Sequence, residues 1–148
     1  MKPESISKDK AKVKKLFKAV SDYAIANQSS AHFNWPDHLI DEALDKYNFY
    51  TDADFNAFII YQSAADFVEI LALGSHPSFR KQGLMQKLLF NFVQKNLNNG
   101  HTVSLEVHEN NMSALNLYKK MGFGLIRTRK GYYRDGCSAL VLQISPKL

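Results

Sequence analysis

Hydrophobic residues recur along the chain at spacings that predict an alternation of helices and strands. Near the start, apolar side chains spaced as on one face of a helix stand at Val13, Leu16, Phe17 and Val20. A second helix is expected after Pro36, with Asp37 as a candidate cap. Short apolar runs between turn-forming residues then predict strands over residues 47–50, 55–61 and 67–73, which would form an antiparallel meander.

The middle of the chain combines a helical and an alternating pattern. Apolar residues at helical spacing predict a helix over residues 84–98, and Gly100 is a plausible left-handed end for it. Residues 103–108 alternate between apolar and polar side chains, which is typical of a strand buried on one face only.

The last third predicts one more helix and two closing strands. Asn110 or Asn111 can cap the helix, and Gly122 ends it. Strands are expected over residues 123–128 and 139–144. The whole pattern predicts an α/β fold with an antiparallel front, a strand–helix–strand crossover in the centre and a strand pair at the end.

Length and composition set the broad class of the protein. A chain of 148 residues is expected to form a single domain over residues 1–148. Its one cysteine, Cys137, cannot build a disulfide framework, and no nucleophile motif surrounds it. The start of the chain lacks the apolar core of a signal peptide, and no apolar stretch is long enough to span a membrane. We therefore expect a cytoplasmic protein with no membrane partner.

The net charge of +5 belongs to one leading segment. Residues 1–18 hold seven lysines against two acidic residues, and the basic and acidic residues of the remainder cancel. One interpretation is an electrostatic contact with a ribosome, RNA or another acidic partner. The preferred interpretation is the solvated face of a first helix, because no aromatic residues alternate with these lysines to stack on bases.

A basic turn between a predicted strand and a predicted helix is the first candidate for chemistry. It covers Arg80–Met85. The start of a helix offers unpaired backbone N–H groups and the positive end of the helix dipole, which together bind phosphate. Gly83 permits a close backbone approach or a positive φ. The alternative is an ordinary strand-to-helix connection with exposed charges.

Three further residues carry two interpretations each. Glu106, on the polar side of its strand, is a solvent-facing carboxylate or a general base. Tyr118 is a core tyrosine or a general acid, because a phenol of pKa about 10 can protonate a basic leaving group. Asn111 is a helix cap or a ligand for the amide groups of a bound molecule.

The string Ser104–Phe123 shifts the balance toward the catalytic and ligand-binding interpretations. It resembles the L-E-V-x-x-x-N-x-x-A-x-x-L-Y-x-x-x-G-F block of the GCN5-related N-acetyltransferase (GNAT) superfamily, and within it the RimI-type ribosomal-protein alanine N-acetyltransferases of bacteria. The turn Arg80–Met85 is similar to the superfamily's pyrophosphate loop, Q/R-x-x-G-x-G/A. Met85 stands where that loop usually ends in glycine or alanine, and helical spacing would place its side chain on the core side.

The resemblance implies a GNAT fold, with a mixed, mostly antiparallel sheet in which a cofactor splays one parallel strand pair. It implies acetyl-CoA as the donor, a primary amine as the acceptor and no metal. Glu106 would take the proton from the amine, and Tyr118 would protonate the leaving thiolate. Cofactor contacts would come from Leu73, Gly74, Ser75, Arg80, Lys81, Gln82, Gly83, Leu84, Met85 and Asn111.

The acceptor is less narrowly defined. The resemblance implies a protein N-terminal α-amine, such as the alanine of a small-subunit ribosomal protein. The segment Asp135–Ala139 lacks the Glu-Asp pair that RimI-type sequences usually carry there, and the lysine-rich start has no counterpart in the family pattern. Two alternatives stay open: a small-molecule amine or polyamine acetyltransferase, and a non-catalytic module that binds CoA or a ribosomal partner.

Overall fold

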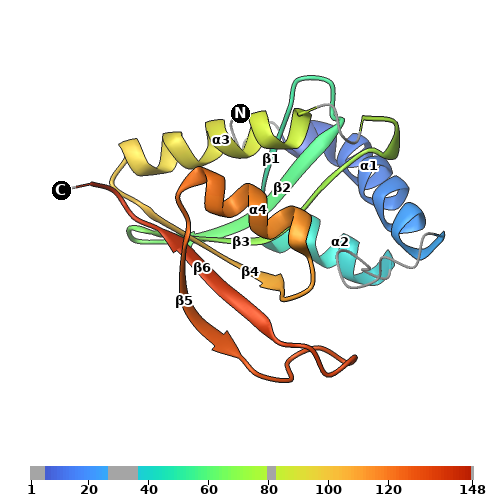
Figure 1. Cartoon of the computed structure of the whole chain (residues 1–148). Helices are drawn as coiled ribbons and strands as arrows, with labels where there is room; N and C mark the ends of the chain where they lie inside the picture. Colours follow the sequence, from blue (N-terminus) through green and yellow to red (C-terminus); the bar gives the residue numbers. More distant parts are fainter. Residues whose placement is uncertain (1–5, 27–36, 80–82, 148) are drawn as a thin grey trace. The chain divides into compact units, whose positions relative to one another are not determined.

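The computed structural model describes residues 6–26, 37–79 and 83–147. Six strands form one sheet in the order β1-β2-β3-β4-β6-β5 (Figure 1). The strands are β1 (Asn48–Thr51), β2 (Ala57–Ala64), β3 (Phe67–Ser75), β4 (Thr102–His108), β5 (Gly124–Arg129) and β6 (Ala139–Ile144). The helices are α1 (Ile6–Ala26), α2 (Asp37–Lys46), the short 3-10 helix η2 (Pro77–Phe79), α3 (Leu84–Asn98) and α4 (Met112–Met121).

The strand directions confirm the predicted mixed sheet. β3 and β4 run parallel, whereas β1–β2, β4–β6 and β5–β6 are antiparallel pairs. The chain divides into two compact units: Met1–Gln62 with Ala72–Leu89, and Ser63–Leu71 with Phe90–Leu148. The single domain expected from the length stays a prediction.

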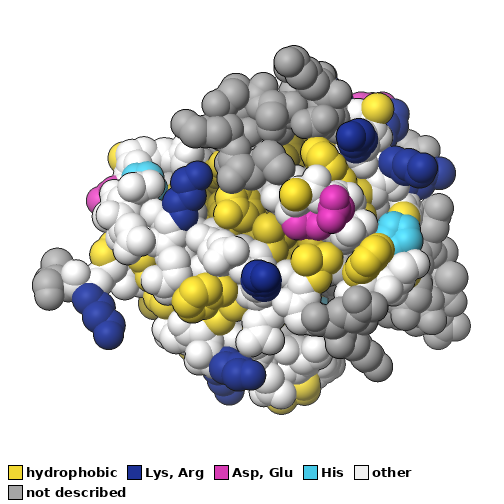
Figure 2. All heavy atoms as spheres, turned by 90° about the horizontal axis from the view of Figure 1, so that it is seen from above, with side chains coloured by type: hydrophobic (Ala, Val, Ile, Leu, Met, Phe, Trp, Pro, Cys, Tyr) yellow, Lys and Arg dark blue, Asp and Glu magenta, His cyan; other side chains and the backbone are white. Residues whose placement is uncertain are grey.

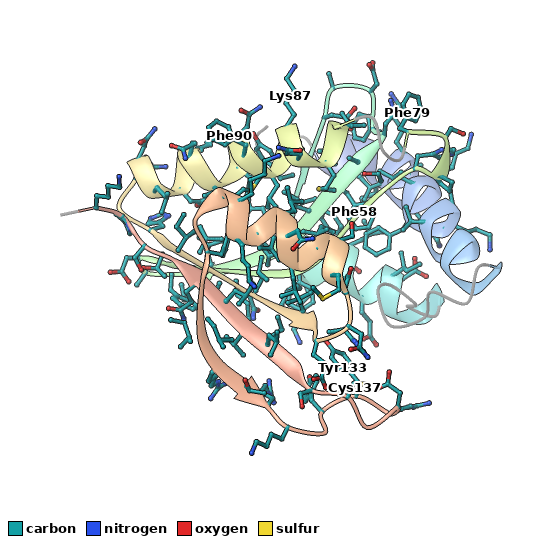
Figure 3. The ribbon with its side chains drawn as sticks, in the orientation of Figure 1. Phe58, Phe79, Lys87, Phe90, Tyr133 and Cys137 are labelled. Carbon is teal, nitrogen blue, oxygen red and sulfur yellow. The ribbon has the colours of Figure 1, made fainter. Side chains whose placement is uncertain are left out.

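Phe17 of α1 occupies the centre of the core of the first unit. Its ring stacks on Phe58 of β2, with centroids 4.5 Å apart, and meets Phe49 of β1 edge-on at 6.0 Å. In the β1–β2 ladder Phe49 lies opposite Ile60 and Thr51 lies opposite Phe58, so both partner rings project from the same face. Figure 3 shows the Phe58 ring beside α1. The apolar stripe predicted near the start of the chain is therefore confirmed as the buried face of α1, since all four of its residues, Val13, Leu16, Phe17 and Val20, are buried.

The turn between β1 and β2 starts one residue later than predicted. Thr51 is the last residue of β1 and is buried, and Phe55, expected in the next strand, has a left-handed backbone with φ of 57°. The Asp52 carboxylate accepts the backbone N–H groups of Asn56 at 2.7 Å and Ala57 at 2.9 Å. An aspartate that satisfies the backbone in this way holds a turn together.

Lysines of the leading segment are used inside the first unit. Lys10 forms an ion pair with Asp45 at 2.6 Å, and Lys14 forms one with Asp41 at 2.8 Å, so α1 is tied to α2, which lies beside it (Figure 1). All four side chains are at least 44% exposed, so each pair contributes little to stability. These contacts favour the interpretation of the segment as a solvated helix face.

In the second unit β4 is buried on both faces, which corrects the prediction of a half-buried strand. Ser104 and His108 are each 5% exposed, although they share the polar side of the pattern with Glu106. Glu106 on that side is accessible in part, with a side chain 25% exposed, and so is Thr102 at the start of the strand. The polar face of β4 is thus covered by other segments and does not face solvent freely.

The ends of α4 follow the sequence signals. The Asn111 side chain accepts the backbone N–H of Ala114 at 3.2 Å and caps the helix start. Gly122 ends the helix with φ of 102°, and its N–H donates to the carbonyl of Lys119. Gly100, with φ of 82°, also adopts the predicted left-handed conformation after α3.

The surface carries mixed side chains. On the face drawn in Figure 2, Lys and Arg side chains lie singly or in small groups between hydrophobic and neutral ones. Within the described parts of the chain, no helix has both the length and the apolar character that crossing a membrane requires.

The aromatic core of the first unit makes a quantitative prediction. Replacing Phe17 with Ala removes a fully buried ring and should lower the free energy of unfolding by about 3–5 kcal/mol. The control is Phe90→Ala, because Phe90 is 52% exposed and projects from α3 (Figure 3); its effect should stay within about 0.5 kcal/mol. Urea unfolding followed by circular dichroism measures both, and similar losses in the two variants would contradict the assignment of the core.

Candidate functional site

The start of α3 has the chemistry of an anion site. Arg80, Lys81 and Gln82 lie outside the described residues. Gly83, exposed and with φ of 76°, accepts the N–H of Lys87 through its carbonyl at 3.0 Å and so caps the helix. The first turn contains no acidic residue, and the N–H groups of such a turn have no partner inside the helix. An anion placed there gains both hydrogen bonds and the helix dipole.

Met85 lies on the side of α3 that packs inward. It is partly buried, and Leu88 and Phe92 on the same stripe are buried. Lys87, by contrast, is exposed and projects from the helix (Figure 3). This arrangement agrees with the expectation that the bulky Met85 side chain turns to the core side and leaves the backbone accessible.

The end of β3 presents backbone that β4 does not pair. The parallel ladder runs from Phe67↔Thr102 to Ile70↔Leu105, whereas β3 continues to Ser75. Leu73, Gly74 and Ser75, all partly exposed, lie in this continuation. On an edge of a strand that no other strand pairs, the outward N–H and C=O groups can form hydrogen bonds with an extended ligand.

Gly74 also has a packing reason to lack a side chain. A Cβ at this position would lie 2.9 Å from Cγ1 of Val20, closer than real Cβ atoms come, and 3.1 Å from the ring of Phe58, which is tighter than most real contacts. Any larger residue at this position would have to displace the side chains of Val20 and Phe58, so the close approach of α1 and β2 within the first unit favours glycine.

Glu106 is held by an arginine that the sequence pattern did not single out as a site residue. Arg129 Nη1 donates to Glu106 Oε2 at 2.8 Å and to Oε1 at 3.3 Å. The hydrogen bond and the charge of Glu106 raise the pKa of Arg129. Glu106 is thus not a free solvent-facing carboxylate, and within the described residues no hydrogen bond or ion pair joins it to Tyr118 or Asn111.

Tyr118 is a buried phenol on the apolar face of α4. It is 5% exposed, its ring lies 5.7 Å from that of Phe123, and burial raises its pKa well above the usual value. The hydroxyl is therefore protonated throughout the physiological range, which is the state a proton donor needs. Its position agrees with either interpretation of the sequence, a core tyrosine or a general acid.

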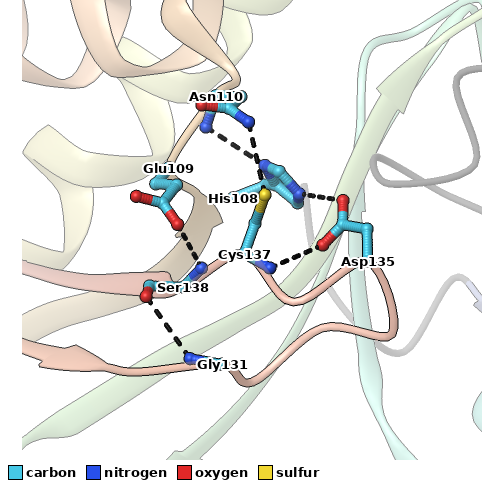
Figure 4. A network of polar contacts seen from close by, with 7 residues as sticks. All are labelled: His108, Glu109, Asn110, Gly131, Asp135, Cys137 and Ser138. Atoms are coloured by element: carbon cyan, nitrogen blue, oxygen red, sulfur yellow. Dashed lines mark hydrogen bonds and ion pairs between the residues drawn. The ribbon is translucent and has the colours of Figure 1, made fainter.

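A second polar network ties the loop before β6 to the end of β4 (Figure 4). His108 Nδ1 accepts the backbone N–H of Asn110 at 3.1 Å, so the ring proton lies on Nε2, which donates to Asp135 at 2.7 Å. The imidazole also stacks on Tyr133, with ring centroids 4.8 Å apart. Glu109 accepts the backbone N–H of Ser138. These contacts explain how His108 is buried without an unsatisfied nitrogen.

The same network contains a set of potential metal ligands. Ligand atoms of His108, Asp135 and Cys137 lie within 4.8 Å of one another. A histidine that binds a metal through Nε2 carries its proton on Nδ1, and the Asn110 N–H blocks that arrangement here. The pKa of the Cys137 thiol is raised by loss of hydration and by nearby Asp135, which disfavours the thiolate. The hydrogen bonds among these residues therefore explain why His108, Asp135 and Cys137 lie close together better than a bound metal ion does.

Two groups of predicted residues thus lie in separate units. Glu106, Asn111 and Tyr118 belong to the second unit, and Leu73–Ser75 with Gly83–Met85 belong to the first. Sequence reasoning missed Arg129 as a partner of Glu106. Two signals in the sequence point to this region: the stretch Arg129–Tyr133 weakly resembles the family, and the adjacent apolar pair at the start of β5 interrupts the alternation before Arg129.

Comparison with known proteins gives consistent matches. The model of the Acetyltransferase (GNAT) family matches residues 22–123. The ribosomal protein bS18-alanine N-acetyltransferase of Haemophilus ducreyi is 37% identical over 86 residues, which cover 57% of this chain and 59% of that protein. The match to the Escherichia coli enzyme of the same name covers 63% of its length, so the chain spans about three fifths of these curated relatives.

Solved structures share the fold. The crystal structure of the ribosomal-protein-S18-alanine N-acetyltransferase from Escherichia coli superposes with a TM-score of 0.68 at 25% identity, covering 78% of this chain and 80% of that one. Ard1 from Thermoplasma volcanium superposes with a TM-score of 0.71 at 24% identity, covering 91% and 94% of the two chains.

The contacts of Asp135 predict a pH-dependent stability. The backbone N–H of Cys137 and the His108 ring lower the pKa of Asp135 below 3.8, so its ionised form stabilises the fold above that pH. Asp135→Asn should be less stable than the parent at pH 6, and the difference should shrink as the pH falls below 3.8, where the parent carboxylate also becomes neutral.

Urea unfolding at pH 6 and at a pH near 3 measures the difference. Asp54→Asn serves as the control, because Asp54 is exposed; its effect should be small at both pH values. A difference for Asp135→Asn that is the same at both pH values would mean that the charge of Asp135 does not matter.

Proposed function

Because the chain belongs to the GNAT family of acetyltransferases, we propose that it transfers the acetyl group of acetyl-CoA to a primary amine, most specifically a protein N-terminal α-amine. The observation that carries this proposal is the pair of proton-handling groups in the second unit. Glu106 presents a partly exposed carboxylate on β4, and Tyr118 presents a buried, protonated phenol on the next helix. Amine acetylation needs one group of each kind.

In the proposed reaction each group moves one proton. Acetyl-CoA supplies a thioester whose carbonyl carbon accepts the amine. As the C–N bond forms, Glu106 takes a proton from the amine nitrogen, directly or through a water molecule. As the C–S bond breaks, Tyr118 gives its proton to the departing sulfur. Burial raises the pKa of Tyr118, so its oxygen carries the proton near pH 7 and releases it only to a strongly basic acceptor such as a thiolate.

The proposed cofactor contacts follow the backbone features of the first unit. Leu73 and Ser75, on the part of β3 that β4 does not pair, would bond the pantetheine arm. The loop 80–85, with Gly83 in a positive-φ conformation at the helix start, would bind the pyrophosphate. Asn111 uses its oxygen to cap α4, and its amide N–H₂ group would contact the cofactor.

The chemistry of deprotonation favours an α-amine as the acceptor. At pH 7 the neutral form of an α-amine with pKa about 8 costs about 1.4 kcal/mol, whereas that of a lysine costs about 4.6 kcal/mol. A single carboxylate base is better matched to an α-amine, because the α-amine has the smaller free-energy cost of deprotonation. The curated relatives from Haemophilus ducreyi and Escherichia coli are named for the alanine of a ribosomal protein, and we propose an acceptor of that kind here.

Substitutions at the two proton-handling residues test the mechanism. Glu106→Gln and Tyr118→Phe should each lower kcat by about 10²-fold or more, because each removes one acid–base group. The Kd for acetyl-CoA, measured by calorimetry, should change less than twofold. Glu42→Gln is the matched carboxylate-to-amide control, since Glu42 is exposed on α2, and it should keep full activity. If both site variants retain the parental kcat, these roles are wrong.

A panel of acceptors tests the substrate class. The protein is incubated with acetyl-CoA and three acceptors: a peptide with a free N-terminal alanine and no lysine, a peptide with a blocked N-terminus and one lysine, and spermidine. Mass spectrometry should find the acetyl group on the alanine peptide. Turnover of spermidine alone would replace the protein acceptor with a small amine. Calorimetry that detects acetyl-CoA binding without turnover of any acceptor would favour a non-catalytic module.

A further inference from the structure

The carboxylate of Glu106 is held in one orientation by a single nitrogen. Arg129 Nη1 lies 2.8 Å from Oε2 and 3.3 Å from Oε1, so Oε2 carries the stronger hydrogen bond. The remaining oxygen, Oε1, is the one with more capacity to accept a proton. No other ion pair to Glu106 occurs in the described residues.

A β-bulge aims Arg129 at this carboxylate. In the β5–β6 ladder Leu125 pairs with Leu142, but Arg127 pairs with Val141, so Ile126 is an extra residue. The shift places Arg127 and Arg129 on the face of β6 where Val141 lies, and Val141 is also the partner of Glu106 in the β4–β6 ladder. If the ladder continued without the bulge, so that Ile126 paired with Val141, Arg129 would project from the opposite face, because strand side chains alternate.

The guanidinium of Arg129 is itself held in place. It lies over the ring of Tyr132, 4.2 Å from the ring centroid, in a cation–π contact. Glu69, which lies opposite Ser104 in the parallel ladder, contributes a further negative charge that acts on Arg129. An arginine fixed on two sides can orient a carboxylate, because it has little freedom to move with it.

We propose that Arg129 is a positioning residue for the proton transfer by Glu106, an assignment that rests on the proposed acetyl transfer. Arg129 binds Oε2 more closely than Oε1, so that Oε1 is the oxygen that takes the proton of the amine, either directly or through water. It takes no proton itself, since the hydrogen bond to Glu106 raises its pKa further. Fixing the orientation of a base raises the rate because fewer encounters have unproductive geometry.

The position of Arg129 separates this role from a role in stability. Its side chain is 41% exposed, and ion pairs this accessible add little to the stability of a fold. Its loss should therefore leave the protein folded and should act on kcat. The KM for acetyl-CoA should change little, because the hydrogen bonds of Arg129 go to the proposed base, which is not among the residues proposed to bind the cofactor.

Three variants test the proposal with the N-terminal alanine peptide as acceptor. Arg129→Gln should lower kcat about tenfold, with the KM for acetyl-CoA changed less than twofold. Arg129→Lys should recover most of the loss, because the arginine uses one nitrogen only and a lysine can supply one. Arg127→Gln is the matched control, since Arg127 is exposed on the same face of the same strand, and it should keep the parental kcat.

A double substitution distinguishes positioning from a general structural effect. If Arg129 acts through Glu106, adding Arg129→Gln to Glu106→Gln should cause no further loss of kcat. An equal tenfold loss in both backgrounds would overturn the proposal, as would an unchanged kcat in Arg129→Gln. The parental protein is measured in the same assay: an inactive parent overturns the proposed function, whereas an active parent with an unaffected Arg129→Gln overturns only the role of Arg129.

Discussion

The bulge in β5 is the constraint on which the charged face of the second unit depends. The ladder of β4 on β6 places Glu106 opposite Val141, and β5 then joins β6 from the other side. One extra residue at Ile126 decides which side chains of β5 project toward Glu106. Bulges of this kind redirect a side chain at small cost in strand pairing, and β5, as the last strand in the sheet order, can accommodate one.

Local signals were sufficient to predict the main helices and strands of the fold. Helix caps and left-handed glycines act within a few residues, so Asn111, Gly122 and Gly100 have the predicted conformations. The burial of β4 could not be predicted in this way. At His108 the second face of the strand is covered by Tyr133 and Asp135, which are far from it in sequence. A strand can be recognised from its own pattern, but what covers it depends on segments that other strands bring to it.

The same distinction applies to the candidate site. Glu106 and Tyr118 belong to one contiguous string, so resemblance could identify them together. Arg129 lies 23 residues from Glu106, and the contact depends on two strand registers and a bulge. Charge patterning was also ambiguous by itself, since the lysines that suggested an acidic partner include Lys10 and Lys14, which pair with α2.

The ion pair also bears on which form of the acceptor would approach Glu106. A carboxylate without a partner attracts a protonated amine, and that form cannot attack a thioester. Arg129 already balances the charge of Glu106 at 2.8 Å, so the attraction for a second cation is reduced. The interaction of Glu106 with a neutral amine is weakened little by Arg129, because the neutral amine approaches as a hydrogen-bond donor to Oε1. The pair would therefore favour the reactive form of the acceptor, and the benefit is greatest for an α-amine, whose neutral form is already accessible near pH 7.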